Sequence, residues 1–268
     1  MQPHPARQEP ARTGVVTRAL GGGTCRGTGI RAVSLICRGA PAGAPRLPTF
    51  DGMRISIFGA GNMAEALGTK WAAHGHDLMI TGRSPEKAAA LAERLNAQVG
   101  SFAEAAHHAE AALIAVLYQG MDYTLDRIGD GLDDKPILDC NNPVEIKDFT
   151  LTTPPGTSMA QHIAKRTGGH VVKAFNLCHA DVWRMPTMTF DGRPLSVPFC
   201  GDNPTALGVA TRLIADVGGV PLPTGDLRHA QYLEATAAII IAQLFGGRPT
   251  RTVFNLVNDQ IPANSLPQ

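Results

Sequence analysis

The sequence predicts an α/β protein, with a Rossmann-like, doubly wound and mostly parallel sheet and a short C-terminal helical extension. Short runs of β-branched and aromatic residues alternate with helical patterns from Arg54 onward, as in a chain of βαβ units. A glycine-rich turn joins the first such run to the first helical pattern. Residues 112–117 form a continuous apolar run, which is typical of a central parallel strand covered on both faces.

The predicted elements follow one another closely along the chain. Strands are expected at 54–58, 77–81, 98–100, 112–117, 136–139, 171–175, 196–200 and 220–222, and helices at 64–74, 86–96, 102–109, 205–217 and 227–245. Ser84 is expected to cap the second helix, with Pro85 at its first position. Residues 235–245 are apolar nearly all round, so we expect this helix to be buried, on the sheet or across a homodimer interface.

Charge divides the chain into unlike parts. The 268 residues carry a net charge of +1, which gives no overall reason to expect binding to nucleic acid or to an acidic membrane. Residues 1–52 hold seven arginines against two acids, and the remainder has a net charge of −4. We therefore expect a leader at 1–52, a nucleotide-binding Rossmann domain at 53–226, and a helical extension and tail at 227–268.

The leader is rich in Gly, Pro, Ala and Arg and shows no sustained periodicity. Such a composition predicts disorder, because it buries too little apolar surface to offset chain entropy. A transit peptide is an alternative reading, and a translation start at Met53 is the reading that we favour.

The cysteines and apolar runs bear on location. The five cysteines form no CxxC pair, which indicates reduced thiols and a cytoplasmic location. The longest apolar run after the leader, 235–245, is too short to cross a bilayer, which takes about 20 residues, so no membrane partner is expected.

The glycine turn fits the dinucleotide fingerprint. Gly59, Gly61 and Ala64 occupy its three positions, with alanine in the permitted third place. Gly59 allows the tight turn, Gly61 allows the backbone to approach a pyrophosphate, and Ala64 allows the helix to pack closely. The motif follows a predicted strand and opens a predicted helix, which favours a nucleotide site over a purely structural turn.

The end of the second strand favours NADP(H) over NAD(H). No acid lies between Met79 and Ser84, where an NAD enzyme usually places one for the ribose hydroxyls. Arg83 stands there instead, with Thr81, Ser84 and Lys87 around it. A guanidinium holds a 2′-phosphate through charge-assisted hydrogen bonds. The alternative is that Arg83 and Lys87 are ordinary solvated cations, although a helix N-terminus disfavours cations.

Several segments together resemble a known family, over nearly all of residues 53–245. They are FGAGNMAEALG, ITGRSPEK, AALIAVLY, LDCNNP, VVKAFNLCHA, PFCGDNP and GDLRHAQYLEA. The chain resembles the NADP oxidoreductases dependent on coenzyme F420, a deazaflavin, and the cytosolic part of the STEAP metalloreductases.

The resemblance implies a role for each matching position. Ala60, Gly61, Asn62 and Met63 would contact the pyrophosphate, and Arg83 and Lys87 the 2′-phosphate. Val116, Leu117, Asn142 and Pro143 would line the nicotinamide side, with Asn176 at the end of another strand near the hydride-transfer face. The chain departs from the family at Gly82, where a serine is common, and at 117–119, where a proline commonly follows the strand.

The predicted activity is hydride transfer between NADPH and a flavin-like acceptor, with coenzyme F420, FMN or FAD as the candidate co-substrate. The cofactor carries this chemistry, so no acid–base residue is assigned.

His179 and Cys178 are candidate functional residues near the site, and no metal site is expected. No lysine follows Lys173, which argues against the lysine-dependent mechanism of β-hydroxyacid dehydrogenases. An imine or carbonyl reductase and a non-enzymatic NADP(H) sensor are the alternative functions.

Overall fold

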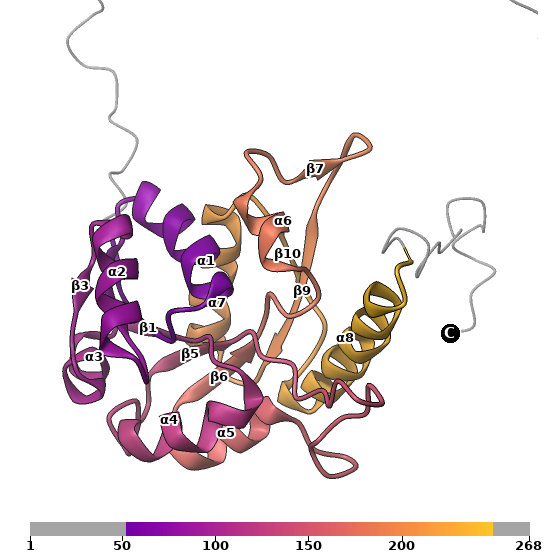
Figure 1. Cartoon of the computed structure of the whole chain (residues 1–268), viewed down its shortest axis with the longest axis horizontal. Coiled ribbons are helices and arrows are strands. Elements are labelled where there is room, and N and C mark those ends of the chain that lie inside the picture. The colour runs from indigo at the N-terminus through magenta and orange to yellow at the C-terminus, as the bar shows by residue number, and fades with distance from the viewer. Residues whose placement is uncertain (1–51, 249–268) are drawn as a thin grey trace, which may run out of the picture. The chain divides into compact units, whose positions relative to one another are not determined.

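The computed structural model describes residues 52–248 and contains an eight-stranded sheet flanked by helices (Figure 1). The strand order is β10-β9-β6-β5-β4-β1-β2-β3. The strands are β1 (Arg54–Phe58), β2 (Asp77–Thr81), β3 (Gln98–Val99), β4 (Ala111–Ile114), β5 (Pro136–Asp139), β6 (His170–Lys173), β9 (Ser196–Gly201) and β10 (Val220–Pro223). A separate two-stranded hairpin joins β7 (Thr189–Phe190) to β8 (Arg193–Pro194).

The sheet is doubly wound around β1. The chain moves outward from β1 to β2 and β3, then returns to β4 on the other side of β1 and continues to β5 and β6. All of these pairs are parallel, whereas β9 pairs antiparallel with β6. The predicted Rossmann-like, mostly parallel sheet is therefore confirmed, with its topological switch point between β1 and β4.

The helices connect the strands and lie on both faces of the sheet. They are α1 (Asn62–Ala73), α2 (Pro85–Leu95), α3 (Phe102–His108), α4 (Met121–Ile128), α5 (Met159–Thr167), α6 (Ala180–Arg184), α7 (Pro204–Asp216) and α8 (Ala230–Phe245), with 3₁₀ turns η1 (Tyr118–Gly120) and η2 (Leu227–His229). Ser84 caps α2 as predicted, because its hydroxyl accepts a hydrogen bond from the Lys87 amide.

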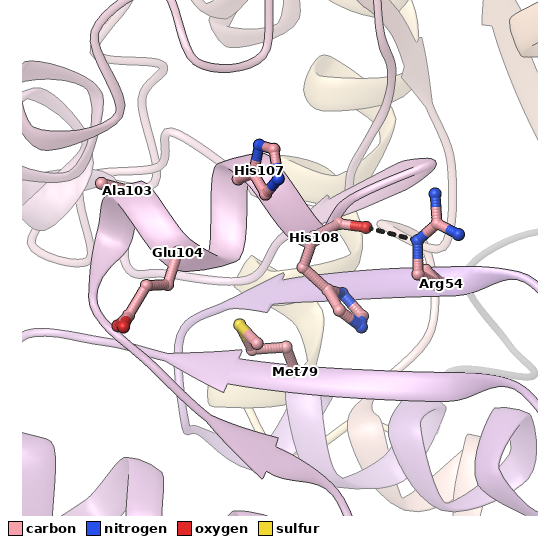
Figure 2. Close-up of a pocket in the computed structure, with 6 residues that line it drawn as sticks. All are labelled: Arg54, Met79, Ala103, Glu104, His107 and His108. Carbon is pink, nitrogen blue, oxygen red and sulfur yellow. Dashed lines mark hydrogen bonds between the residues drawn. The ribbon is translucent and has the colours of Figure 1, made fainter.

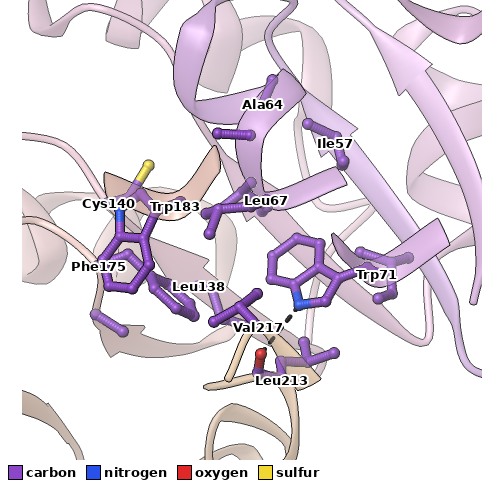
Figure 3. Close-up of a cluster of buried hydrophobic side chains, with 14 of the residues drawn as sticks. Ile57, Ala64, Leu67, Trp71, Leu138, Cys140, Phe175, Trp183, Leu213 and Val217 are labelled. Atoms are coloured by element: carbon purple, nitrogen blue, oxygen red, sulfur yellow. Dashed lines mark hydrogen bonds between the residues drawn. The ribbon is translucent and has the colours of Figure 1, made fainter. Parts of the chain in front are cut away.

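Two hydrophobic clusters hold the helices to the sheet. One contains side chains of α1, α2, α6 and α7, and Figure 3 shows part of it around Trp71 and Trp183. The Trp71 indole N–H donates to the main-chain oxygen of Leu213 at 3.0 Å, which ties α1 to α7. The other cluster contains side chains of α3, α4, α5 and α8. Both faces of the central strands are thus covered.

Burial of 235–245 on the sheet is found only for part of the helix, and the alternative, burial across a homodimer interface, stays a prediction. Ala237 and Ala238 are buried, but Ile239, Leu244 and Phe245 are exposed among the described residues. Only one stripe of α8 faces α5 and β9, so an apolar composition all round does not place every side chain in the core. No described helix is long and apolar enough to cross a membrane.

Other differences concern element ends and short elements. The strands predicted at 112–117 and 171–175 end earlier, at Ile114 and Lys173, so the residues after them belong to loops. Helices α4, α5 and α6 were not predicted. The expected leader lies outside the described residues except for its last position, and so does the tail after residue 248.

Candidate nucleotide-binding site

The glycine turn lies at the carboxyl end of β1, beside the switch point. The Gly59 amide donates to the main-chain oxygen of Thr81 at 2.8 Å, which joins the turn to the end of β2. Gly59 has φ +127°, and a Cβ there would overlap the main-chain oxygen of Ala115. Any larger residue at this position would therefore push the turn away from the loop after β4.

The space next to the Cα of Gly61 is open, whereas the space next to the Cα of Gly59 is filled. It is the N-cap of α1 with φ −98°, and a Cβ built on it would meet nothing within 4 Å. No side chain caps this helix, so its first amides are available to an anion. Asn62 and Met63 form the first turn of α1, so the helix begins two residues before the predicted start at 64.

Arg184 of α6 reaches this loop, a feature that the sequence analysis missed. Its guanidinium donates to the Asn62 side-chain oxygen at 3.3 Å and to Glu65 at 3.1 Å. A cation therefore lies beside the open N-terminus of α1. Because Arg184 follows Asn62 by 122 residues, no local pattern reveals the contact.

A cavity of about 470 Å³ lies at the end of β2. It is lined by Thr81, Gly82, Arg83, Pro85, Ala88, Val99, Gly100, Ser101, Phe102, Tyr123 and Arg127. The lining contains two arginines and no carboxylate, so its charge suits an anion.

The structure separates the predicted residues of this region into two groups. Thr81, Gly82 and Arg83 line the cavity together. Ser84 and Lys87 lie beside it at the start of α2 and do not line it. The Ser84 hydroxyl donates to the Glu86 carboxylate at 2.8 Å, so its proton already has an acceptor.

On the other side of the switch point, the loops after β4, β5 and β6 lie at the same edge of the sheet. Val116 and Leu117 follow β4, and the Leu117 side chain is 80% exposed. The Asn142 amide donates to the main-chain oxygen of Asn176 at 2.8 Å, and the Asn176 amide donates to the Asn142 side-chain oxygen at 3.0 Å. Pro143 is buried next to this pair. The two asparagines thus fix one loop against the other.

A buried ionic triad of Lys173, Asp139 and Glu234 lies next to these loops. The Lys173 ammonium donates to Asp139 at 2.9 Å, to Glu234 of α8 at 2.8 Å and to the main-chain oxygen of Asn141 at 2.5 Å. All three charged side chains are fully buried. Glu234 also accepts from the Met159 amide at 3.0 Å, at the start of α5.

The triad contains one cation and two carboxylates, and these charges together with burial shift the pKa values of its members. Burial alone would lower the pKa of Lys173, but attraction to Asp139 and Glu234 outweighs it and raises that pKa. Burial raises the pKa of Glu234, against the opposing attraction to Lys173. Lys173 therefore remains charged within the fold.

The two sequence candidates near this edge have ordinary surroundings. The His179 side chain is 62% exposed and accepts a hydrogen bond from the Asp181 amide, so it caps α6. Burial raises the pKa of Cys178 to about 11, which keeps its thiol protonated at neutral pH. Neither feature indicates a catalytic group. No described cluster of three His, Cys, Asp or Glu side chains could hold a metal ion.

A larger cavity, of about 710 Å³, lies beside α3, near Arg54 at the start of β1 and Met79 in the middle of β2. Figure 2 shows its lining residues, which include Arg54, Glu104 and His108. Beside it, the Ser56 hydroxyl lies 3.2 Å from His108 Nδ1, and His108 Nε2 lies 3.2 Å from Asp77.

This Ser–His–Asp arrangement was not predicted from the sequence, and it does not form a nucleophilic site. Ser56 is fully buried, and its hydroxyl donates to the main-chain oxygen of Ala105 at 2.6 Å. Its proton is therefore directed away from His108, the opposite of what a nucleophile requires. The arrangement joins α3 to the sheet.

Comparison with known proteins is consistent with this site. Residues 54–143 match the family model described as NADP oxidoreductase, coenzyme F420-dependent. The metalloreductase STEAP3 of Rattus norvegicus is 29% identical over 68% of this chain, but the chain spans only 36% of that protein. The F420-dependent NADP reductase of Methanothermobacter marburgensis is 25% identical over 70% of this chain and 91% of its own length.

Solved structures show the same fold. A crystal structure from Arthrobacter sp. FB24, named for an F420-dependent NADP reductase, has a TM-score of 0.66 at 22% identity and covers 74% of this chain and 96% of its own. A reductive aminase from Aspergillus terreus with bound NADPH has a TM-score of 0.54 at 18% identity, and the match covers 73% of this chain and 63% of the aminase.

The doubly wound sheet, the open glycine turn and the matched family define an NADP-dependent oxidoreductase. Residues 54–143 match the family of NADP oxidoreductases dependent on coenzyme F420, the family that the motifs of the chain resemble.

Proposed function

We propose that the protein transfers hydride between NADPH and a flavin-like acceptor, either coenzyme F420 or FMN/FAD. The observation that carries this proposal is the cavity at the end of β2, where Arg83 stands without a described ion-pair partner and no carboxylate joins the lining. The open N-terminus of α1 lies beside it. This combination suits a dinucleotide that bears an additional phosphate on its adenosine ribose.

Each residue has a proposed role in binding the cofactor. Gly59, Ala60, Gly61, Asn62 and Met63 would surround the pyrophosphate. Thr81, Gly82 and Arg83 would hold the 2′-phosphate, with Ser84 and Lys87 at its outer side. Val116, Leu117, Asn142, Pro143 and Asn176 would place the nicotinamide at the shared edge of the loops.

A flavin-like acceptor agrees with the groups at this edge. Hydride transfer between two rings needs apposed faces and excluded water, and no proton donor at the reacting carbon. The side chains that the structure brings there are amides and apolar groups, while Lys173 is occupied by its two carboxylates. A relative that the chain covers to 91% is named an F420-dependent NADP reductase.

The imine-reductase alternative rests on fold similarity. The match covers 63% of the reductive aminase structure, so more than a third of that enzyme lies outside the similarity. The sensor alternative predicts binding of NADPH without turnover and a protein partner.

Turnover assays test the proposal directly. Purified protein is expected to oxidise NADPH in the presence of coenzyme F420 or FMN and to use NADH poorly. Arg83→Ala should weaken NADPH binding by about tenfold or more and leave NADH binding nearly unchanged, because one charge-assisted bond contributes about 1.5–3 kcal/mol. The absence of NADPH oxidation with every acceptor would contradict the proposal, and so would a preference for NADH.

Location, domain limits and assembly complete the proposal. We place the protein in the cytoplasm, with domain limits at 53–226 and 227–268 and a small-molecule redox acceptor as its partner. Tyr232 and Ile239, seven residues apart on one face of α8, are exposed among the described residues, which would suit a homodimer interface. Sedimentation is expected to show a dimer at micromolar concentration, and a monomer alone would contradict this assembly.

A further inference from the structure

The cavity at the end of β2 has a second wall, which comes from α4. The wall that holds Thr81, Gly82 and Arg83 was expected from the sequence, whereas Tyr123 and Arg127 line the cavity from a helix that was not predicted. In a doubly wound sheet, the crevice at the switch point lies outside the carboxyl ends of the strands. The helix that follows β4 is therefore placed to contact a ligand held at the end of β2.

Tyr123 and Arg127 form a supported pair on this wall. The Arg127 guanidinium carbon lies 3.5 Å from the centroid of the Tyr123 ring, a cation–π arrangement. One Arg127 nitrogen also donates to the main-chain oxygen of Tyr123 at 3.4 Å. The Tyr123 ring in turn meets Phe102 edge-on, with centroids 6.3 Å apart. The guanidinium is thus held over the face of the Tyr123 ring at an exposed position, where a ligand can reach it.

The charge of Arg127 is not balanced by a described carboxylate. Neighbouring acids on α4 pair elsewhere, since Asp122 and Asp126 contact Arg166 of α5. The last turn of α4 favours a cation through the helix dipole, which explains a basic residue there. The dipole does not explain why a second arginine faces the same cavity as Arg83 with no acid in the lining.

Building on the proposed function, we propose that Arg127, supported on Tyr123, is a second cationic ligand of the adenosine 2′-phosphate. Two like charges around one cavity repel each other in the empty state, and a dianionic phosphate between them removes that repulsion. The aromatic surface of Phe102 and Tyr123 supplies apolar contact for adenine next to the phosphate. Helix α4 then contributes to the preference for NADP(H) together with the end of β2.

The test uses two cofactor fragments that differ only in the position of one phosphate. Binding of 2′,5′-ADP and of 3′,5′-ADP to the full chain is measured by titration calorimetry. Arg127→Ala is expected to weaken 2′,5′-ADP by about tenfold or more, because a charge-assisted bond is lost, and to change 3′,5′-ADP far less. Arg127→Lys should fall between, because it keeps the charge and loses the planar donors.

Further variants separate this role from a structural one. Tyr123→Phe keeps the ring beneath the guanidinium and should bind like the unmodified protein, whereas Tyr123→Ala should resemble Arg127→Ala. Arg166→Ala, which removes an arginine paired with acids on α4, is the matched control and should leave 2′,5′-ADP binding unchanged. Thermal melts of each variant check the fold.

The outcomes distinguish this inference from the function on which it rests. Unchanged 2′,5′-ADP binding by Arg127→Ala, or equal losses for both fragments, would overturn the role of Arg127 while the preference for NADPH over NADH stands. If the unmodified protein fails to prefer 2′,5′-ADP and NADPH, the proposed function is overturned as well.

Discussion

Lys173→Met is expected to lower the free energy of unfolding by about 3–5 kcal/mol. Among the described residues, Lys173 is the cation that pairs with both Asp139 and Glu234, so the substitution leaves two buried carboxylates without it. A typical domain is stable by about 5–15 kcal/mol, so this loss is a large part of the total. Urea unfolding at neutral pH, followed by circular dichroism, measures the change.

A double variant separates the lost charge from the changed shape. Lys173→Met combined with Glu234→Gln should recover part of the stability, because one uncompensated charge is removed with its partner. Lys165→Met, on the exposed side of α5, is the matched control and should change stability by about 0.5 kcal/mol or less. A Lys173→Met protein as stable as this control would contradict the buried triad.

Gly61→Ala is expected to weaken NADPH binding by about tenfold to 100-fold without disturbing the fold. The added methyl group enters open space, so nothing in the protein opposes it. That space is where the main chain of the turn would approach a pyrophosphate, so the methyl group would hold the phosphates away from the first amides of α1. Fluorescence titration with NADPH, combined with a thermal melt, measures both effects.

The control for Gly61→Ala is the same substitution elsewhere. Gly208 lies in α7, where a Cβ also meets nothing within 4 Å, so Gly208→Ala should preserve binding and add the helix preference of alanine. Equal NADPH binding by Gly61→Ala and Gly208→Ala would show that the turn does not approach the cofactor. Melting at a lower temperature than the unmodified protein would contradict the open space at Gly61.

The sequence predicted the features that depend on interactions between neighbouring residues. The strand at 54–58, the turn that follows it and the Ser84 cap all depend on residues within a few positions of one another, so the sequence alone revealed them. Helix α4 was missed although its buried residues, Met121, Thr124, Leu125 and Ile128, have the spacing of one helix face, because eight residues are few for such a pattern. The wall that α4 gives to the cavity at the end of β2 was missed with it.

Contacts between distant residues could not be predicted from the sequence. Lys173 is separated from Asp139 by 34 residues and from Glu234 by 61, and each residue alone resembles an ordinary charge. A single glutamate within the apolar pattern of α8 was the one available signal of a buried partner. The exposed end of α8 shows the converse limit, because composition does not reveal which stripe of a helix faces the sheet.

The contacts of Glu234 determine which elements unfold together with α8. Its carboxylate contacts β6 through Lys173 and the first amide of α5 through Met159, so detaching α8 would expose two donors at once. Such a helix does not fray independently. Its slowest-exchanging amide protons should exchange with deuterium only when those of β6 and α5 do, as parts of one cooperative unit.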